Sequence, residues 1–342
     1  MDIFELTFNE LTRQFKTLYG KGPYHASAVM REILRHGNMN FQDCEEFVRS
    51  PDLAARIKKD LAISVPEITR TISEEGTVKY IGRLKDGLET ESVVIPMKSH
   101  NTLCVSCQIG CRMGCRFCET GSMGFKRNLT TSEIVGQVYA ARFVLGKNIK
   151  NIVFMGMGEP FDNLSSVLKA IEVLSDQKGF DIAHSHMTLS TAGLVDGINA
   201  LGAMNLKRLH LAISLNAPND EIRARLMPVN SKHSMAELKK ALLEYPLRDR
   251  GSFLIGYVVI KGLNDSVDHA DQLARFLSPL PVRLNLIPLN KTSGFDYPPT
   301  EDGDIHRFGS YLEQRGIFVI KRWSRGQKLA AGCGQLGRAC ES

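Results

Sequence analysis

The sequence has no long run of hydrophobic residues. None of its apolar stretches approaches the roughly 20 residues that a helix needs to cross a bilayer, so we expect no membrane association. The N-terminus, MDIFELTFNE, is acidic and lacks the basic segment followed by an apolar segment that marks a secretion signal. These two absences predict a cytoplasmic protein.

Aromatic residues and internal repeats are also scarce. Aromatic residues make up 7% of the chain, tryptophan occurs once, and no repeat or low-complexity segment is present. With 342 residues, of which 43% are hydrophobic and 23% charged, the chain can form one large domain or two unequal ones. The net charge of +6 is compatible with a polyanionic partner such as RNA.

Cysteine, in contrast, is concentrated in one place. Five of the eight cysteines lie in CVSCQIGCRMGCRFC, residues 104–118. Cys111, Cys115 and Cys118 form a Cys-x3-Cys-x2-Cys group, and neighbouring glycines allow a tight backbone around it. Because the cytosol keeps thiols reduced, we expect these cysteines to bind a metal or to react.

Two metal centres are compatible with this group. Cysteine-bound [4Fe–4S] clusters normally use four thiolates, so three thiolates would leave one iron open to a small molecule. The alternative is a structural zinc ion bound by Cys104-x2-Cys107 and Cys115-x2-Cys118. Only seven residues separate those pairs, which is short for zinc, and Cys111 would have no role. The pattern therefore favours the cluster.

The N-terminal part of the chain is expected to form helices and then a hairpin. Residues 2–62 have the apolar spacing of helices, and residues 68–96 have the pattern of strands. Residues 77–84 and 89–95 predict a hairpin around the turn Lys85-Asp86-Gly87. We therefore predict a small accessory domain over residues 1–96.

Residues 97–323 alternate short apolar runs with helical patterns. Expected strands are residues 102–106, 151–155, 186–190, 208–215, 253–260 and 282–288, and helices are expected from residues 131, 164, 195, 220, 235, 265 and 302. Such repeated units predict an α/β fold with a parallel sheet. Periodicity alone leaves open whether the sheet is a partial barrel or doubly wound. Residues 324–342, rich in glycine and basic residues, predict a flexible tail.

Polar residues follow several expected strands. The carboxyl ends of parallel strands share one face of a barrel, where active sites lie, so one site is expected to collect these residues. In MGMGEP, residues 155–160, the glycines would let backbone carbonyls approach a ligand, and Glu159 could accept a hydrogen bond from an ammonium group. The remaining candidates are Ser190, Ser214, Leu215, Asn216 and Asn290.

These motifs resemble those of a known family. The Cys-x3-Cys-x2-Cys group is similar to the signature of radical S-adenosylmethionine (SAM) enzymes, and from about Glu91 to Leu336 the chain resembles the RlmN/Cfr family of RNA adenine methyltransferases. The resemblance implies an incomplete (βα)6 barrel and a [4Fe–4S] cluster on Cys111, Cys115 and Cys118, with SAM on the open iron. It also implies an accessory domain that helps to hold RNA, and an electron donor such as flavodoxin or ferredoxin.

The resemblance further implies roles for individual residues. Cys333, in AAGCGQLG, matches the cysteine that is methylated during catalysis, although a lone tail cysteine is by itself more often incidental. Cys104 matches the second essential cysteine and Glu91 the proposed proton acceptor. In the family, the residues that match Gly158, Glu159, Ser190, Ser214, Leu215, Asn216 and Asn290 contact SAM, and the position of Asn216 is usually histidine.

The family chemistry explains why two cysteines and a base are needed. A hydrogen-bearing adenine carbon is electrophilic, so the methyl cation of SAM cannot attack it directly. In the family, the residue that matches Cys333 takes a methyl group from one SAM, and a 5'-deoxyadenosyl radical from a second SAM activates that methyl group for addition to adenine. The residue that matches Glu91 removes the ring proton. The residue that matches Cys104 releases the product by forming a disulfide bond with the methylated cysteine.

The motif MGMGEP, with proline after the glutamate, is more similar to the RlmN branch of the family than to the Cfr branch. This favours carbon 2 of a 23S rRNA adenine over carbon 8, with a tRNA adenine as a further substrate. Basic clusters, best Lys126-Arg127, predict contact with RNA. Two alternatives stay open: a radical SAM enzyme with another substrate, and a zinc-stabilised RNA-binding protein without catalysis.

Overall fold

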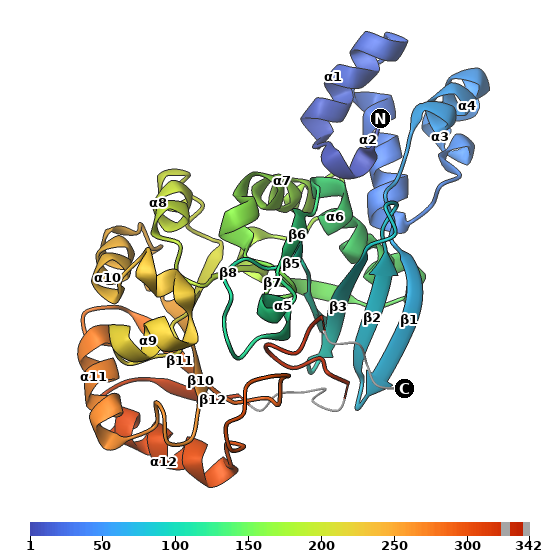
Figure 1. The fold of residues 1–342 in the computed structure, drawn as a ribbon. Coiled ribbons are helices and arrows are strands. Elements are labelled where there is room, and N and C mark those ends of the chain that lie inside the picture. The colour runs from blue at the N-terminus through green and yellow to red at the C-terminus, as the bar shows by residue number, and fades with distance from the viewer. Residues whose placement is uncertain (323–328, 338–342) are drawn as a thin grey trace.

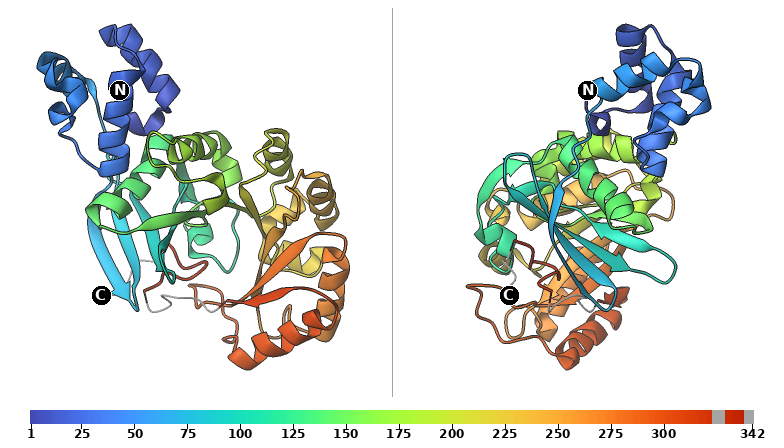
Figure 2. Two further views of the ribbon diagram at one scale, coloured as in Figure 1. Left: turned by 180° about the vertical axis from the view of Figure 1, so that it is seen from behind. Right: turned by 90° about the vertical axis from the view of Figure 1, so that its right-hand side faces the viewer.

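The structure is a computed structural model that describes residues 1–322 and 329–337. Figure 1 shows a group of N-terminal helices beside a curved sheet whose outer side is lined with helices. The N-terminal helices stand at one end of the molecule in both views of Figure 2. No helix in the described part of the chain has the length and apolar character needed to cross a bilayer.

The N-terminal helices follow local sequence signals. Thr7 and Glu10 form a capping box at the start of α1, and Gly20 ends that helix in a left-handed conformation. Pro51 begins α4, where the amide hydrogen that proline lacks would have no helical partner. The helices are η1 (Ile3–Glu5), α1 (Phe8–Tyr19), α2 (Pro23–Met30), η2 (Arg31–Arg35), η3 (Phe41–Asp43), α3 (Glu45–Val48) and α4 (Pro51–Asp60).

One ten-stranded sheet forms the centre of the molecule, in the order β1-β2-β3-β4-β7-β8-β9-β10-β11-β12. Neighbours from β1 to β4 are antiparallel, and all later neighbours are parallel. The antiparallel strands are β1 (Glu67–Glu74), β2 (Thr77–Arg83), β3 (Glu89–Pro96) and β4 (Asn101–Cys104). The others are β7 (Ile149–Phe154), β8 (Met187–Thr191), β9 (His210–Ser214), β10 (Phe253–Val259), β11 (Val282–Pro288) and β12 (Val319–Lys321).

The sheet has two free ends, at β1 and β12, so the barrel is incomplete. The predicted α/β fold with a partial barrel is thereby confirmed, and β12 is a short strand that the sequence did not predict. The outer helices are α6 (Thr131–Tyr139), which continues into η4 (Ala140–Val144), α7 (Leu164–Ser175), α8 (Val195–Ala203), α9 (Asp220–Leu226), α10 (Met235–Glu244), α11 (Val267–Leu277) and α12 (Asp302–Glu313). Each begins within two residues of its expected position.

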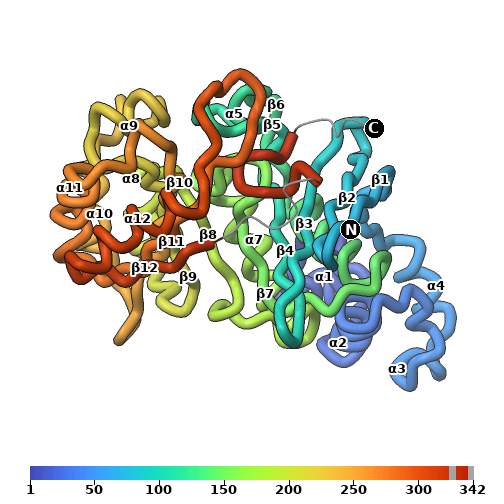
Figure 3. Tube along the Cα trace, turned by 90° about the horizontal axis from the view of Figure 1, so that it is seen from below, coloured from blue at the N-terminus to red at the C-terminus, as the bar shows by residue number. Residues whose placement is uncertain are grey.

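Short elements complete the fold near the cysteine-rich stretch. Strands β5 (Gln108–Gly110) and β6 (Phe125–Asn128) form a separate antiparallel ribbon, and α5 (Glu119–Ser122) lies between them in sequence. The 3-10 turns are η5 (Pro160–Asn163), η6 (His184–His186) and η7 (Pro228–Ser231). In Figure 3 the segment 329–337 lies beside α5, β5 and β6.

The predicted division into residues 1–96, 97–323 and 324–342 stays a prediction. Strand pairing continues across residue 96, because Pro96 of β3 pairs with Asn101 of β4, so the hairpin is the antiparallel margin of the barrel sheet. Trp323 and, in the predicted tail, Arg325, Lys328, Arg338 and Cys340 lie outside the described residues.

Candidate functional site

The loop that carries Cys111, Cys115 and Cys118 closes on itself through glycine. Gly110 has a φ of 72°, and a Cβ there would lie 1.7 Å from the carbonyl oxygen of Gly124. The Cys111 amide donates to that same oxygen, at 3.1 Å. Glycine at position 110 therefore permits the contact that folds the loop.

The three thiols lie close enough to affect one another's ionisation. The pKa of Cys111 is raised to about 12, mainly by burial and to a smaller extent by Glu159 and Cys118. Burial is also the main cause of the raised pKa of Cys115, to which Cys118 and Cys111 add. The group is therefore protonated until a cation displaces the protons.

The donor set suits an iron–sulfur cluster better than a single ion. Among the described residues, no three His, Cys, Asp or Glu side chains surround one metal position. The zinc alternative is not supported, since Cys104 interacts with Cys333, and the Cys107 thiol donates to the Met157 carbonyl oxygen at 3.6 Å.

The polar residues at the strand ends lie along one edge of the sheet, as expected. Ser190 of β8 pairs with Ala212 of β9, and Ser214 pairs with Gly256 of β10. The remaining candidates directly follow β7, β9 and β11: Gly158, Glu159, Leu215, Asn216 and Asn290. That these residues contact SAM stays a prediction.

The two glycines of MGMGEP are required by close packing, and their predicted approach to a ligand stays a prediction. A Cβ on Gly156 would lie 2.7 Å from the Val105 carbonyl oxygen, and one on Gly158 would lie 2.5 Å from the Gln108 Cβ. The sequence analysis did not identify Gln108 as a residue of the site. Its Oε1 accepts from the Glu159 amide at 2.8 Å.

Glu159 joins the ends of two strands. One carboxylate oxygen accepts from the Phe161 amide at 3.1 Å, and the other accepts from the Ala192 amide at 2.7 Å. Burial outweighs these bonds and raises the pKa of Glu159 to about 7. An ammonium group at this position would stabilise the charged form.

Asn216 forms hydrogen bonds within the protein. Its φ is 59°, in the left-handed region that asparagine tolerates better than histidine or leucine. The side-chain oxygen accepts from the Val258 amide at 2.9 Å, and the side-chain nitrogen donates to the Met227 sulfur at 3.3 Å. Its side-chain polar groups therefore both have partners within the protein.

Cys104 and Cys333 meet where the C-terminal segment packs on the sheet. Val93, Cys104, Met157 and Leu336 form one small apolar cluster. Burial raises the pKa of Cys104 to about 12, and Cys333 adds to the increase. All seven described cysteines are free, so these two are not joined by a disulfide bond in this structure.

Cys333 is accessible to solvent, although many protein atoms lie around its thiol. The surrounding atoms raise the pKa of its thiol, and Arg322 partly offsets this. Lys328 and Arg338, whose charges could favour a thiolate at Cys333, lie outside the described residues, so thiolate character at Cys333 stays a prediction.

Glu91 is buried beside a lysine that the sequence analysis missed. Glu91 is 6% exposed, and its Oε2 lies 2.8 Å from the Nζ of Lys79, which is fully buried. Position 79 pairs with position 93 across the hairpin, so Lys79 and Glu91 are diagonal neighbours on one face. The hairpin register, once assigned, would have revealed this pair.

Most of the hydrogen bonds that hold segment 329–337 use its backbone. Lys79 Nζ donates to the Ala330 carbonyl oxygen at 3.1 Å, and the Gly337 amide donates to Glu91 Oε2 at 3.0 Å. On the other side, Thr120 Oγ1 donates to Leu336 and the Glu119 amide donates to Gly334. Asn290 Nδ2 donates to the Cys333 carbonyl oxygen at 2.9 Å. This part of the predicted tail is therefore anchored.

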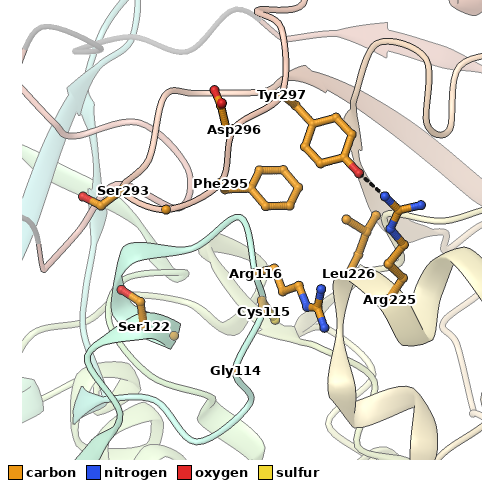
Figure 4. Close-up of a pocket in the computed structure, with 12 residues that line it drawn as sticks. Gly114, Cys115, Arg116, Ser122, Arg225, Leu226, Ser293, Phe295, Asp296 and Tyr297 are labelled. Carbon is orange, nitrogen blue, oxygen red and sulfur yellow. Dashed lines mark hydrogen bonds between the residues drawn. The ribbon is translucent and has the colours of Figure 1, made fainter.

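A cavity of about 540 Å³ lies against the loop that carries Cys111, Cys115 and Cys118. Figure 4 shows Phe295 and Tyr297 facing Arg116 and Arg225 across it, with the Arg225 guanidinium donating to the Tyr297 hydroxyl. Cys115 lines this cavity, whereas none of the residues expected to contact SAM does.

The basic pair Lys126-Arg127 is only partly available for RNA. Arg127 donates two hydrogen bonds to Glu133, at 2.7 and 2.9 Å, and one to Asp86 at 2.7 Å. It thus ties β6 to α6 and to the hairpin turn. Lys126 is exposed and keeps the expected role as a prediction.

Comparisons with known proteins place the chain in a family. Residues 105–277 match the family model described as the radical SAM superfamily. The chain is 43% identical to the probable dual-specificity RNA methyltransferase RlmN 1 of Protochlamydia amoebophila, over 93% of this chain and 88% of the relative. It is 41% identical to the dual-specificity RNA methyltransferase RlmN of Geobacter sulfurreducens, over 98% and 92%.

A solved structure agrees over nearly the whole length. The radical SAM methyltransferase from Sphaerobacter thermophilus superposes with a TM-score of 0.88 and 35% identity, covering 98% of both chains. These findings confirm the resemblance inferred from the cysteine group and the strand-end motifs. The chain belongs to the radical SAM superfamily and, within it, to the RlmN family of RNA methyltransferases.

Proposed function

We propose that this RNA methyltransferase methylates carbon 2 of an adenine in 23S rRNA, and of a tRNA adenine as a second substrate, through an S-methylcysteine at Cys333. The observation that carries this proposal is that the segment carrying Cys333 packs on the sheet beside Cys104 and bonds through its backbone to Glu91 and to the cysteine-rich loop. The names of the relatives, which include dual specificity for RNA, support the substrate class.

Radical SAM enzymes use a [4Fe–4S] cluster and SAM. In this proposal Cys111, Cys115 and Cys118 hold the cluster, and the strand-end residues Gly158, Glu159, Ser190, Ser214, Leu215, Asn216 and Asn290 hold SAM. When bound, these groups supply the methyl group and the radical that removes one hydrogen atom from it. An electron donor of the flavodoxin or ferredoxin class would provide the electrons.

Cys333 carries the methyl group on its sulfur after losing the thiol proton. The methylene carbon that forms on this sulfur bonds to carbon 2 of adenine, which links RNA and protein. Glu91 accepts the proton that carbon 2 loses. The ion pair with Lys79 holds the Glu91 carboxylate in place for this step.

Cys104 ends the covalent stage. Its thiol loses a proton and its sulfur bonds to the sulfur of Cys333 as the carbon–sulfur bond breaks. The released carbon takes up that proton, and one electron passes from the adduct to an oxidised carrier of the flavodoxin or ferredoxin class. The resulting disulfide bond then needs two electrons from a reductant. Burial of Cys104 keeps it protonated at rest, which protects it from premature oxidation.

The decisive test is anaerobic analysis of iron, sulfide and zinc. We expect about four irons and four sulfides per chain and a brown protein. A variant with alanine at Cys111, Cys115 and Cys118 should lose them. Stoichiometric zinc without iron in the wild type would contradict the proposal and support an RNA-binding protein without catalysis.

A second experiment tests the covalent stage. With Cys104→Ala, we expect protein covalently linked to RNA to accumulate, because the sulfur that releases the product is absent; denaturing electrophoresis with labelled RNA would detect it. Cys333→Ala should abolish both linkage and methylation. Full activity of Cys333→Ala would instead support a radical SAM enzyme with a different mechanism. Mass spectrometry of digested RNA distinguishes carbon 2 from carbon 8.

A further inference from the structure

Arg223 is a buried cation that forms no ion pair with a carboxylate among the described residues. It lies on α9 and is the largest side chain that is fully buried. Its two terminal nitrogens donate to neutral acceptors, the Asn230 Oδ1 at 2.9 Å and the Ala192 carbonyl oxygen at 2.5 Å. Its Nε has no hydrogen-bond partner among the described residues.

The carboxylate that acts most on Arg223 is already engaged. Asp220 Oδ1 accepts from Asn230 Nδ2 at 2.9 Å and from the Met235 amide at 2.8 Å. Burying a guanidinium without an anion is costly, because its hydration is lost and nothing replaces it. An anion that is not a side chain of this region would complete the site.

The position of Arg223 indicates which anion this is. The Arg116 amide, next to Cys115, donates to the Leu226 carbonyl oxygen at 3.0 Å, so α9 packs directly under the cysteine loop. Cys115 also packs against Leu226 and Met227 in one apolar cluster. Burial lowers the pKa of Arg223 to about 10, and Cys115 and Asp220 act against this decrease.

We propose that Arg223 is the counter-charge of the cysteine-bound [4Fe–4S] cluster on its Cys115 side, and that it favours reduction of the cluster. This inference rests on the proposed function, in which Cys111, Cys115 and Cys118 hold the cluster. Binding converts three neutral thiols into thiolates, which adds negative charge above Arg223. Reduction adds one more electron, and a nearby buried cation stabilises the reduced state more than the oxidised state.

Two other roles for Arg223 are possible in chemical terms, and they predict different results. As a purely structural residue, it would only tie the loop after β8 to η7 through Ala192 and Asn230. As a ligand of the SAM carboxylate, it would affect SAM affinity but not the cluster alone. The measurements are therefore made first without SAM and then with it.

The test uses full-length protein loaded anaerobically with iron and sulfide. Arg223→Gln removes the charge but keeps donors, and Arg223→Lys keeps the charge. An electron paramagnetic resonance titration without SAM follows reduction. For Arg223→Gln we expect about a tenfold lower ratio of reduced to oxidised cluster at a fixed potential, equivalent to about 59 mV for a one-electron couple. Arg223→Lys should titrate close to the wild type.

Arg225→Gln is the matched control, because it removes an exposed charge from the same helix. Water screens that charge, so in Arg225→Gln the ratio of reduced to oxidised cluster should change less than about threefold. If Arg223→Gln titrates like the wild type but binds SAM more weakly, the proposal is overturned, and Arg223 is instead a ligand of the SAM carboxylate. Equal loss of iron from Arg223→Gln and Arg223→Lys would overturn it in favour of a structural role.

One further outcome supports the proposal even without a titration. If Arg223→Gln fails to retain iron while Arg223→Lys retains it and titrates like the wild type, charge and not shape is what the site needs. Wild-type protein that binds no cluster would contradict the proposed function itself, and this result is obtained before any variant is compared.

Discussion

Single residues in this protein have settings that their type alone does not reveal. Asn216 was expected as a ligand contact, and its side chain is bonded within the protein to Val258 and Met227. Glu91, by itself typical of an exposed strand residue, is buried against Lys79. Motif spacing located both residues correctly, but burial and partners depend on tertiary packing that a linear pattern does not contain.

Replacing Asn216 should show how much the left-handed backbone costs. Asn216→Ala loses the bond to the buried Val258 amide, about 1–3 kcal/mol, and adds backbone strain of about 1–2 kcal/mol. Asn216→Gly loses the same bond without the strain. We expect the glycine variant to unfold about 2–4 °C above the alanine variant, measured by calorimetry on the metal-free protein. Equal midpoints would argue against strain at this position.

Removing Lys79 should be more harmful than removing the Lys79–Glu91 pair. Lys79→Met leaves the buried Glu91 carboxylate without its counter-charge, which costs about 3–5 kcal/mol. The double variant Lys79→Met/Glu91→Gln removes the unpaired charge and should recover most of that loss. Urea unfolding of the single and double variants measures the difference. A double variant as unstable as Lys79→Met would show that the ion pair is not the cause.

At the scale of elements, the sequence predicted the long units and missed the short ones. The alternation of apolar runs and helical spacing located every parallel strand from β4 to β11, and capping boxes such as Thr130-x-x-Glu133 marked helix starts. β5, β6 and β12 have three or four residues each, too few for a periodic pattern. The anchoring of residues 329–337 rests on backbone bonds, which leave no trace in side-chain type.

The C-terminal segment can be loosened at one glycine. Gly334 has a φ of 82°, and a Cβ there would lie 2.8 Å from the Phe117 carbonyl oxygen. Gly334→Ala should therefore displace the segment that carries Cys333 and reduce methylation at least about tenfold, the effect of about 1.4 kcal/mol. Iron content should be unchanged. Hydrogen exchange at residues 329–337 should become faster.

Gly316 provides the control for this substitution. Its φ is 75°, yet no atom lies within 4 Å of the position that a Cβ would occupy. Gly316→Ala therefore adds similar backbone strain at a turn without a clash. We expect its methylation rate to stay near that of the wild type. A similar loss of activity in both variants would mean that the loss in Gly334→Ala does not come from displacement of segment 329–337.

At the scale of the whole molecule, a few polar contacts fasten the N-terminal helices to the barrel. Lys169 of α7 reaches Glu10 of α1 at 2.5 Å, and Asp176 Oδ2 accepts from the Phe8 amide at 2.7 Å. Phe4 packs beside Tyr139 with ring centroids 5.1 Å apart. The helices and the barrel are thereby joined by charge as well as by apolar packing.

The Glu10–Lys169 contact makes this attachment sensitive to acid. Burial tends to raise the pKa of Glu10, but hydrogen bonds from Lys169 and Thr7 outweigh it and lower the pKa to about 2. Because the folded-state pKa lies below the unfolded value, the stabilisation is present above about pH 4.5 and is lost toward pH 2.

We expect the contact to contribute about 1 kcal/mol, because both side chains are partly exposed and solvent weakens the interaction. Lys169→Met should lower the unfolding midpoint in urea at pH 6, and its difference from the wild type should shrink as the pH falls below 4. Lys240→Met, which removes an exposed lysine of α10, is the control. A difference that does not change with pH would assign the effect to packing.

The two margins of the ten-stranded sheet bear on self-association. A strand with an unpaired side can join another chain and start a fibre. Strand β1 carries charged residues along its length and has an irregular register between Ile68 and Arg70, and β12 has only three residues. Both margins are thus poor templates for a second sheet, so the barrel stays open without inviting aggregation through its edges.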